Sequence, residues 1–101
     1  MAKSVIWSER AIADRKSILN YWYKRNKSME YPRKINGLFK EAVILISQYP
    51  NIGRPTQHKS ARVKVVRDYL IVYDETNEFI EILSIWDTRQ DPEKLEEVIG
   101  R

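Results

Sequence analysis

The order of the hydrophobic patterns most limits what this chain can fold into. Apolar residues recur at helical spacing from Glu9 to about Asn26 and again from Ser28 to Tyr49. Three later segments instead show the short β-branched and aromatic runs that are typical of strands. They span Arg62 to Val66, Tyr69 to Tyr73 and Phe79 to Trp86. The tight polar turns between them predict an antiparallel meander that follows two helices.

Single residues indicate where these elements begin and end. Lys3 to Trp7 predict an opening strand, and Ser8 is placed to cap the first helix. Ser28 is a candidate cap for the second helix, and Pro50 ends that helix. Gly37 lies inside the second helix at a cost of about 1 kcal/mol relative to alanine. Close packing of the two helices would offset this cost.

The remaining segments complete the predicted fold. Residues 50 to 61 contain two prolines and one glycine without periodicity, which predicts an irregular connection. A short final helix is expected from Asp91 to Gly100, because Asp91 can cap it and Pro92 suits its first turn. We therefore predict a single α+β domain over residues 1–101. It has an N-terminal strand, a two-helix hairpin packed on a curved antiparallel sheet with a three-strand C-terminal meander, and a short C-terminal helix.

The composition excludes several classes of site. The chain has no cysteine and a single histidine, His58, so a disulfide framework or a zinc site of the usual kind is not expected. We expect no metal and no cofactor. The first residues lack the apolar core of a secretory signal, and the longest apolar run, Ala42 to Ile46, is too short to cross a membrane. We therefore expect a cytoplasmic protein.

Charge is distributed unevenly along the chain. Residues 1–67 carry 15 lysines and arginines against 4 acidic residues, whereas residues 68–101 carry 3 against 10. A basic surface of this kind suggests an acidic partner: nucleic acid, an enzyme bound to nucleic acid, or an acidic protein. The simpler alternative is that these cations only solvate the helix faces.

Four short stretches carry a family resemblance that covers nearly the whole chain. They are Trp-Ser-Glu-Arg-Ala at the start of the first helix, Tyr-Pro-Asn-Ile-Gly-Arg-Pro at residues 49–55, Asp-Tyr-Leu-Ile-Val-Tyr at 68–73, and Ile-Leu-Ser-Ile-Trp-Asp-Thr-Arg-Gln at 82–90. In this order they resemble the RelE/ParE toxin superfamily. The Pro-x-Ile-Gly-Arg-Pro pattern is most similar to the ParE-like branch. In it, Gly53 is expected to permit a backbone bend that a Cβ would obstruct.

The resemblance implies the toxin of a type II toxin-antitoxin system, neutralised by an acidic antitoxin. ParE-like members of the superfamily inhibit DNA gyrase without a hydrolytic site of their own. Other members cut messenger RNA on the ribosome and carry basic residues on the first meander strand, matched here by Arg62 and Lys64. With Arg67 and Arg89, these residues would form an electrostatic site that assists attack of a ribose hydroxyl on the adjacent phosphate.

Two departures from the nuclease pattern favour the ParE-like interpretation. The nucleases place an arginine directly after the tyrosine matched by Tyr69, where this chain has Leu70, and a tyrosine or histidine in the final segment, where this chain has neither after Tyr73. We therefore expect a gyrase inhibitor. A ribosome-dependent messenger RNA endonuclease is the alternative, and a non-toxic relic that only binds its partner is a third possibility.

The basic residues on and around the meander are the candidate site. Strand alternation places Arg62 and Lys64 on one face, which we expect to point outward as part of a single uncovered cationic ridge. The alternative is an edge strand whose charges only prevent aggregation. The residues predicted to bind nucleic acid or a protein partner are Arg54, Lys59, Arg62, Lys64, Arg67 and Arg89.

Other polar and aromatic residues have simpler interpretations. Asp14 and Arg15 are expected on a solvated face of the first helix. Asp87 is expected to cap a turn or pair with an arginine rather than to act as a general base. Tyr69 and Tyr73 share a strand face and are expected in the core, although tyrosines at such positions can also stack on bases.

Overall fold

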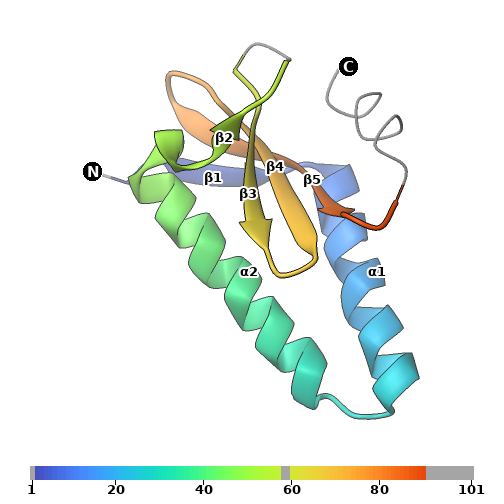
Figure 1. Cartoon of the computed structure of the whole chain (residues 1–101). Coiled ribbons are helices and arrows are strands. Elements are labelled where there is room, and N and C mark those ends of the chain that lie inside the picture. The colour runs from blue at the N-terminus through green and yellow to red at the C-terminus, as the bar shows by residue number, and fades with distance from the viewer. Residues whose placement is uncertain (1, 58–59, 91–101) are drawn as a thin grey trace.

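The computed structural model describes residues 2–57 and 60–90, which form an α+β fold (Figure 1). In chain order the elements are β1 (Ser4–Trp7), α1 (Glu9–Asn26), α2 (Glu30–Gln48), the 3-10 helix η1 (Pro50–Ile52), β2 (Arg54–Pro55), β3 (Arg62–Val66), β4 (Tyr69–Glu75) and β5 (Phe79–Asp87). The predicted opening strand, two helices and three-strand meander are therefore confirmed. The helix predicted from Asp91 to Gly100 lies outside the described residues.

The strands form one sheet in the order β1-β5-β4-β3-β2. Strands β2 to β5 pair antiparallel, but β1 runs parallel to β5, so the sheet is mixed rather than wholly antiparallel as predicted. The backbone N–H of Lys3 donates to the carbonyl of Ser47 at 3.0 Å, which places the end of α2 beside the start of β1. The helical hairpin thus returns the chain to the level where β1 began, and β3 and β5 run in the direction of β1.

The stretch predicted to be irregular contains two short elements that the sequence did not reveal. After η1, strand β2 adds to the edge of the sheet, with Arg54 opposite Val63 and Pro55 opposite Arg62. A proline is tolerated there because an edge strand has one side without a neighbour that needs its N–H. The prediction of a wholly irregular connection is therefore wrong.

The predicted helix ends are only partly confirmed. The Ser8 hydroxyl accepts from the N–H of Ala11 at 3.0 Å, which confirms it as the cap of α1. Met29, not Ser28, occupies the cap position of α2, although the Ser28 hydroxyl accepts from the N–H of Glu30 at 3.1 Å. A Cβ at Gly37 would meet no atom within 4 Å, so the expected close packing of the helices at this glycine is also wrong.

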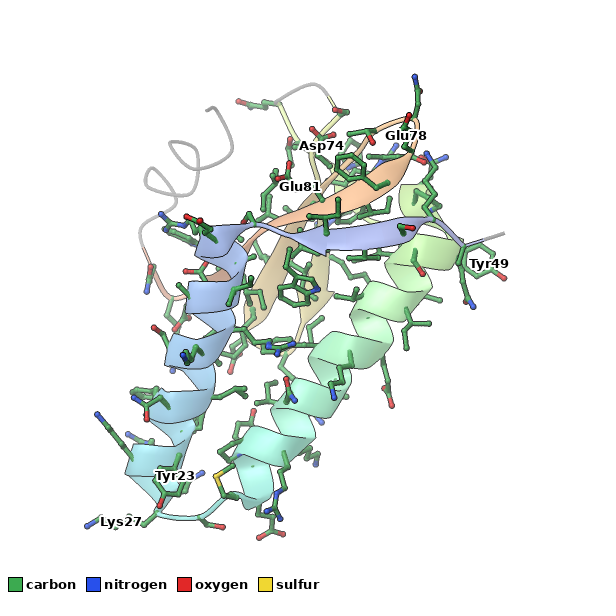
Figure 2. The ribbon with its side chains drawn as sticks, turned by 180° about the vertical axis from the view of Figure 1, so that it is seen from behind. Tyr23, Lys27, Tyr49, Asp74, Glu78 and Glu81 are labelled. Atoms are coloured by element: carbon green, nitrogen blue, oxygen red, sulfur yellow. The ribbon has the colours of Figure 1, made fainter. Side chains whose placement is uncertain are left out.

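The two helices cover one face of the sheet, and their connected ends extend beyond it (Figures 1 and 2). Side chains from both layers form the core, and the predicted burial of Tyr69 and Tyr73 is confirmed. The core residues are Ala11, Ile35, Phe39, Ala42, Val43, Ile46, Val66, Tyr69, Ile71, Tyr73, Ile80, Ile82 and Ile85. Within the described parts of the chain, neither helix is long and apolar enough to span a bilayer.

Candidate functional site

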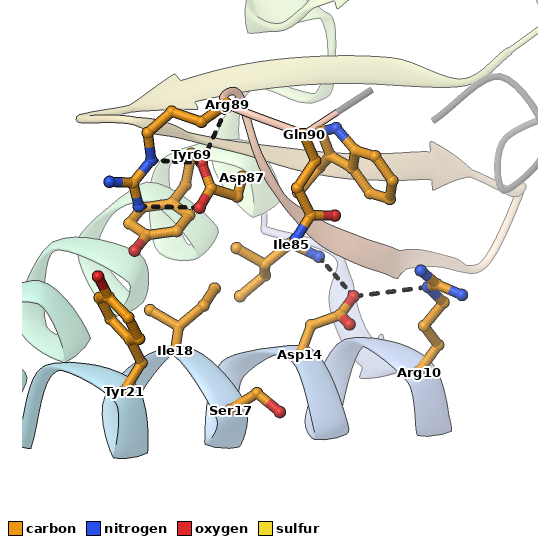
Figure 3. Close-up of a pocket in the computed structure, with 11 residues that line it drawn as sticks. Arg10, Asp14, Ser17, Ile18, Tyr21, Tyr69, Ile85, Asp87, Arg89 and Gln90 are labelled. Atoms are coloured by element: carbon orange, nitrogen blue, oxygen red, sulfur yellow. Dashed lines mark hydrogen bonds and ion pairs between the residues drawn. The ribbon is translucent and has the colours of Figure 1, made fainter. Parts of the chain in front are cut away.

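A pocket opens between α1 and the end of β5 (Figure 3). It encloses about 540 Å³. Arg10, Asp14 and Tyr21 line it from α1, and Asp87 and Arg89 line it from the end of β5. A volume of this size is in the range that protein pockets offer to small molecules or to protruding side chains of a partner.

Asp14 ties α1 to the sheet at the edge of this pocket. Its Oδ2 accepts hydrogen bonds from the hydroxyl of Ser84 at 2.8 Å and from the N–H of Ile85 at 3.1 Å. Strand β1 pairs with β5 only as far as Ile82, so no strand of the described residues reaches the N–H of Ile85 on this side. Because Asp14 serves as the missing acceptor, the prediction that it lies on a solvated face is wrong.

The prediction that Arg15 lies on a solvated face of α1 is also wrong. Its guanidinium lies 5.0 Å from the centre of the Trp7 ring, the geometry of a cation–π contact. The side chain of Arg15 is half-buried over this aromatic ring. This contact explains how an arginine can occupy a position within the apolar stripe of α1.

The end of β5 is organised by an ion pair between Asp87 and Arg89. The guanidinium donates from Nε to Oδ1 at 3.0 Å and from Nη2 to Oδ2 at 2.8 Å, and the backbone N–H of Arg89 donates to Oδ1 at 2.9 Å. These hydrogen bonds lower the pKa of Asp87 and raise the pKa of Arg89. The prediction that Asp87 caps a turn and pairs with an arginine is confirmed.

Tyr69 forms the buried end of the pocket. Its hydroxyl oxygen accepts from Nε1 of Trp22 at 2.8 Å. Burial raises the pKa of the Tyr69 phenol, so the phenol stays protonated at neutral pH. Trp22 is itself fixed by edge contacts with the rings of Tyr21 and Tyr31, whose centres lie 5.1 and 4.8 Å away. Tyr21 and Tyr69 thus give the pocket an aromatic side that Trp22 supports from behind.

Arg62 and Lys64 share one face of β3 as predicted, but this is the face toward the helices. Arg62 lies opposite Tyr73 and Lys64 lies opposite Ile71, and residues directly opposite on neighbouring strands share a face. Both opposing residues belong to the core. The expectation that Arg62 and Lys64 point outward is therefore wrong, and it is Val65 that is exposed on the opposite side.

The cations near β2 lie on different sides of the sheet. Nη1 of Arg62 donates to the carbonyl of Gly53 at 2.7 Å and to that of Asn51 at 3.4 Å, so this guanidinium holds the chain that follows α2. Arg54 lies opposite Val63 and therefore on the face away from the helices, where it is exposed. These two candidate residues do not converge.

The other cations lie at the far end of the meander. Arg67 is the first residue of the β3–β4 turn, and Arg89 follows the end of β5. Arg62 is level with Tyr73, whereas β5 ends level with Tyr69, four residues along β4. At about 3.3 Å per residue, roughly 13 Å separates the two levels. The prediction of one continuous cationic ridge is therefore wrong, although the binding role of each residue stays a prediction.

One candidate residue, Lys59, cannot be placed, because residues 58–59 lie outside the described residues. In the described ranges, no three histidine, cysteine or acidic side chains are grouped as metal ligands.

Comparison with known proteins identifies the family. The model of the family described as the ParE toxin of the type II toxin-antitoxin system, parDE, matches residues 5–92. This chain belongs to the ParE toxin family. The predicted resemblance to the ParE-like branch is thereby confirmed. None of the curated proteins matches the chain.

A solved structure shows that this ParE family toxin shares its fold with a known relative. The relative is a chain from the chromosomal ParDE toxin-antitoxin system of P. aeruginosa, with 23% sequence identity and a TM-score of 0.76. The match covers 87% of this chain and 98% of the relative. At this identity the match supports the fold alone.

The α1 side of the pocket was not predicted from the sequence. A signal for it nevertheless exists, because Arg10, Asp14, Ser17 and Tyr21 recur at helical spacing and all four line the pocket. In this ParE family toxin, a polar stripe thus marks the side of α1 that borders the end of β5.

Proposed function

We propose that this ParE family toxin inhibits DNA gyrase in the cytoplasm through a protein contact and that an acidic antitoxin neutralises it. Membership of the family supports the toxin class. The excess of positive charge in residues 1–67 supports acidic partners, since it favours encounter with an anionic surface. The relative of known structure belongs to a ParDE system, which supports an antitoxin as one of these partners.

The separation of the candidate cations carries the choice of an inhibitor over a nuclease, and the protonation of the pocket agrees with it. General acid–base catalysis works best with groups whose pKa lies near the working pH. In this pocket burial raises the pKa of Tyr69, and hydrogen bonds from Arg89 lower the pKa of Asp87. Both groups are therefore moved away from neutrality. The separation of Arg62 from Arg89 along the sheet also argues against their joint action on one phosphate.

The exposed cations are the proposed contacts. Arg54, Arg67 and Arg89 have exposed side chains at both ends of the meander, and we include Lys59 with them. Because exposed charges mainly govern the rate and specificity of association, reversing one should weaken inhibition without unfolding the protein.

A supercoiling assay with purified gyrase tests this function. The wild-type toxin should block supercoiling, and Arg54→Glu or Arg89→Glu should raise the concentration needed by about tenfold, since a reversed charge at a contact costs on the order of 1 to 2 kcal/mol. Lys16→Glu, an exposed charge reversal on α1, is the matched control. Unaffected supercoiling at saturating wild-type toxin would rule out gyrase as the target.

The alternatives give different results in the same cells. A ribosome-dependent endonuclease would create new ends in translated messages, which toeprinting detects, and Arg62, Lys64, Arg67 and Arg89 would then be its electrostatic site. A non-toxic relic would leave growth unchanged when the protein is expressed without any antitoxin. Growth arrest with intact messages and inhibited gyrase is the pattern expected here.

A further inference from the structure

The connected ends of the two helices form a basic tip, residues 23–34, that extends beyond the sheet (Figures 1 and 2). Its cations are exposed and come from both helices and their connection: Lys24 and Arg25 from α1, Lys27 from the connection, and Arg33 and Lys34 from α2. Glu30 is the one acid among residues 23–34. Five cations against one acid give the basic tip a net charge of +4, equal to that of the whole chain.

These cations are not neutralised by neighbouring carboxylates. The ion pairs within the described parts of the chain lie elsewhere: they join Lys3 to Glu75, Arg10 to Asp14, and Arg89 to Asp87. Acidic side chains lie at the opposite end of the molecule, where Figure 2 labels Asp74, Glu78 and Glu81 far from Tyr23 and Lys27. A molecule polarised in this way turns its basic end toward an anionic partner during encounter.

Aromatic contacts join the two helices beside the basic tip. The ring of Trp22 meets the ring of Tyr31 edge-on, with centres 4.8 Å apart, and Nε1 of Trp22 donates to the hydroxyl of Tyr69 at 2.8 Å. These contacts connect the last turns of α1 to the start of α2 and to the sheet. The cations of both helices are therefore presented on one surface.

The conformation of Lys27 indicates that positive charge is kept at the basic tip at a cost in stability. Lys27 has a left-handed φ of 51°, and its N–H donates to the carbonyl of Tyr23 at 2.7 Å, which closes α1. Helices that end in this way mostly use glycine, because a Cβ is unfavourable in the left-handed conformation. Backbone strain of this kind is concentrated at sites that contact ligands or partners.

We propose that the basic tip binds the phosphate backbone of double-stranded DNA without reading its sequence. The inference goes beyond the proposed function, since this binding needs no gyrase. Duplex DNA carries one negative charge per about 1.7 Å of its axis, so a cluster of cations meets several phosphates at once. Lysine, arginine and tyrosine side chains are among the groups that proteins present to phosphate oxygens. Tyr23 and Met29, which are 47% and 45% exposed, add a hydroxyl and apolar area to this surface.

Two other anionic partners fit the basic tip less well. A helix that binds a membrane surface inserts a continuous apolar face, and its affinity grows with the apolar area inserted. The large exposed apolar side chains of residues 23–34 are only Tyr23 and Met29. Proteins bind single-stranded nucleic acid in basic grooves where several aromatic side chains stack on bases. The basic tip protrudes instead, and Tyr31 is partly buried, which leaves Tyr23 as its exposed aromatic residue.

Titration of a fluorescent DNA duplex with the full chain, followed by anisotropy without gyrase, tests the proposal. We expect a Kd of about 1 to 100 μM near physiological salt, equal for duplexes of unrelated sequence. With five phosphate contacts, the logarithm of the association constant should fall with the logarithm of salt concentration with a slope of about −4.5. The affinity should thus drop about 500-fold from about 50 to 200 mM salt. No binding at about 100 μM protein and 50 mM salt would overturn the proposal.

Variants of Lys27 separate the basic tip from the total charge. Lys27→Gly removes one cation and relieves the left-handed conformation, so this variant should fold at least as well as the wild type. It should weaken DNA binding about tenfold near 0.1 M salt and reduce the salt slope by about 0.9. Lys27→Arg keeps the charge and should bind as the wild type does. Lys16→Gln removes one exposed cation from the middle of α1 and should leave the slope unchanged. Equal effects of Lys27→Gly and Lys16→Gln would contradict a localised site.

The remaining cations test whether both helices take part. Replacing Lys24 and Arg25 together by glutamine, or Arg33 and Lys34 together, should in each case reduce the salt slope by about 1.8. An effect of only one pair would contradict a site shared by the two helices.

Competition experiments distinguish DNA from other anionic partners. The competitors are single-stranded RNA of equal length, poly-glutamate at equal charge, and vesicles of phosphatidylserine and phosphatidylcholine. We expect each to bind more weakly than the duplex, and tighter binding of any one would assign the basic tip to that partner and overturn the proposal. Failure of the gyrase assay alone would reject the proposed target and leave this inference standing. Gyrase inhibition without DNA binding would reject this inference alone.

Discussion

The hydroxyl of Tyr73 offers the sharpest test of how the Pro-x-Ile-Gly-Arg-Pro stretch is held. Tyr73 is fully buried, and its hydroxyl donates to the carbonyl of Pro50 at 2.6 Å and accepts from the N–H of Gly53 at 2.9 Å. Tyr73→Phe removes both hydrogen bonds and leaves both backbone groups unpaired. At about 0.5 to 1.5 kcal/mol for each bond, we expect the free energy of unfolding to fall by roughly 2 kcal/mol.

The loss can be measured by urea denaturation followed by circular dichroism at neutral pH. For a chain of this size it corresponds to a fall in Tm of roughly 10 °C. Tyr49→Phe is the matched control, because Tyr49 is 62% exposed and its substitution should change stability by less than about 0.5 kcal/mol. If Tyr73→Phe were no less stable than this control, the anchoring role of the hydroxyl would be wrong.

The same phenol makes stability depend on pH. Burial raises the pKa of Tyr73, so the folded state retains the proton more strongly than the unfolded state, whose tyrosines titrate near pH 10. Its contribution is present in full below that pH and is lost as the pH rises through the folded pKa. The wild-type protein should therefore lose more stability than Tyr73→Phe as the pH rises above about 10. Equal losses would show that this phenol is not protected.

A double-mutant cycle with Gly53 completes the test. A Cβ on Gly53 would lie 2.6 Å from Oη of Tyr73, 2.8 Å from its Cε1 and 2.9 Å from the carbonyl of Val63. Gly53→Ala should therefore cost about 1 to 3 kcal/mol through overpacking. The cost should be smaller in the Tyr73→Phe background, because the closest of the three contacts is then gone. Strict additivity would contradict a clash with the hydroxyl.

Three further predictions can be checked by the same denaturation experiment. Gly37→Ala should raise stability by about 0.5 to 1 kcal/mol, since the helix gains propensity and the new methyl group meets open space. Lys27→Gly and Arg67→Gly should each raise it by roughly 1 kcal/mol, because both residues have positive φ. Asp14→Ala should lower it by about 1 to 3 kcal/mol, because the buried hydroxyl of Ser84 loses its acceptor.

The helices and the meander were predictable because their patterns are local. The apolar stripe of α2 recurs over five turns, and Ser8 caps α1 through an atom three residues away. Strand β2 has no such pattern. Its two residues are extended because Gly53 is fixed by Tyr73, twenty residues later in the chain, and that contact forms only in the folded protein.

The wrong prediction that Arg62 and Lys64 point outward from β3 has a physical cause. Val63 and Val65 are more apolar than Arg62 and Lys64, so hydropathy alone directs the valines inward. The pairing with β4 decides otherwise, because Tyr73 and Ile71 are buried and their neighbours must share their face. The long stems of arginine and lysine can line an apolar layer while their charged ends reach its rim.

The conformation of the Pro-x-Ile-Gly-Arg-Pro stretch also determines where the uncovered edge of β3 begins. Because Arg54 lies opposite Val63 in an antiparallel pair, a longer β2 would place Ile52 opposite Val65. Instead Pro50–Ile52 forms η1, and Tyr73 holds the carbonyl of Pro50 and the N–H of Gly53. The chain therefore turns away from β3 where its free edge begins. The motif that closes α2 onto the sheet thus also ends the pairing of β2 with β3 after two residues.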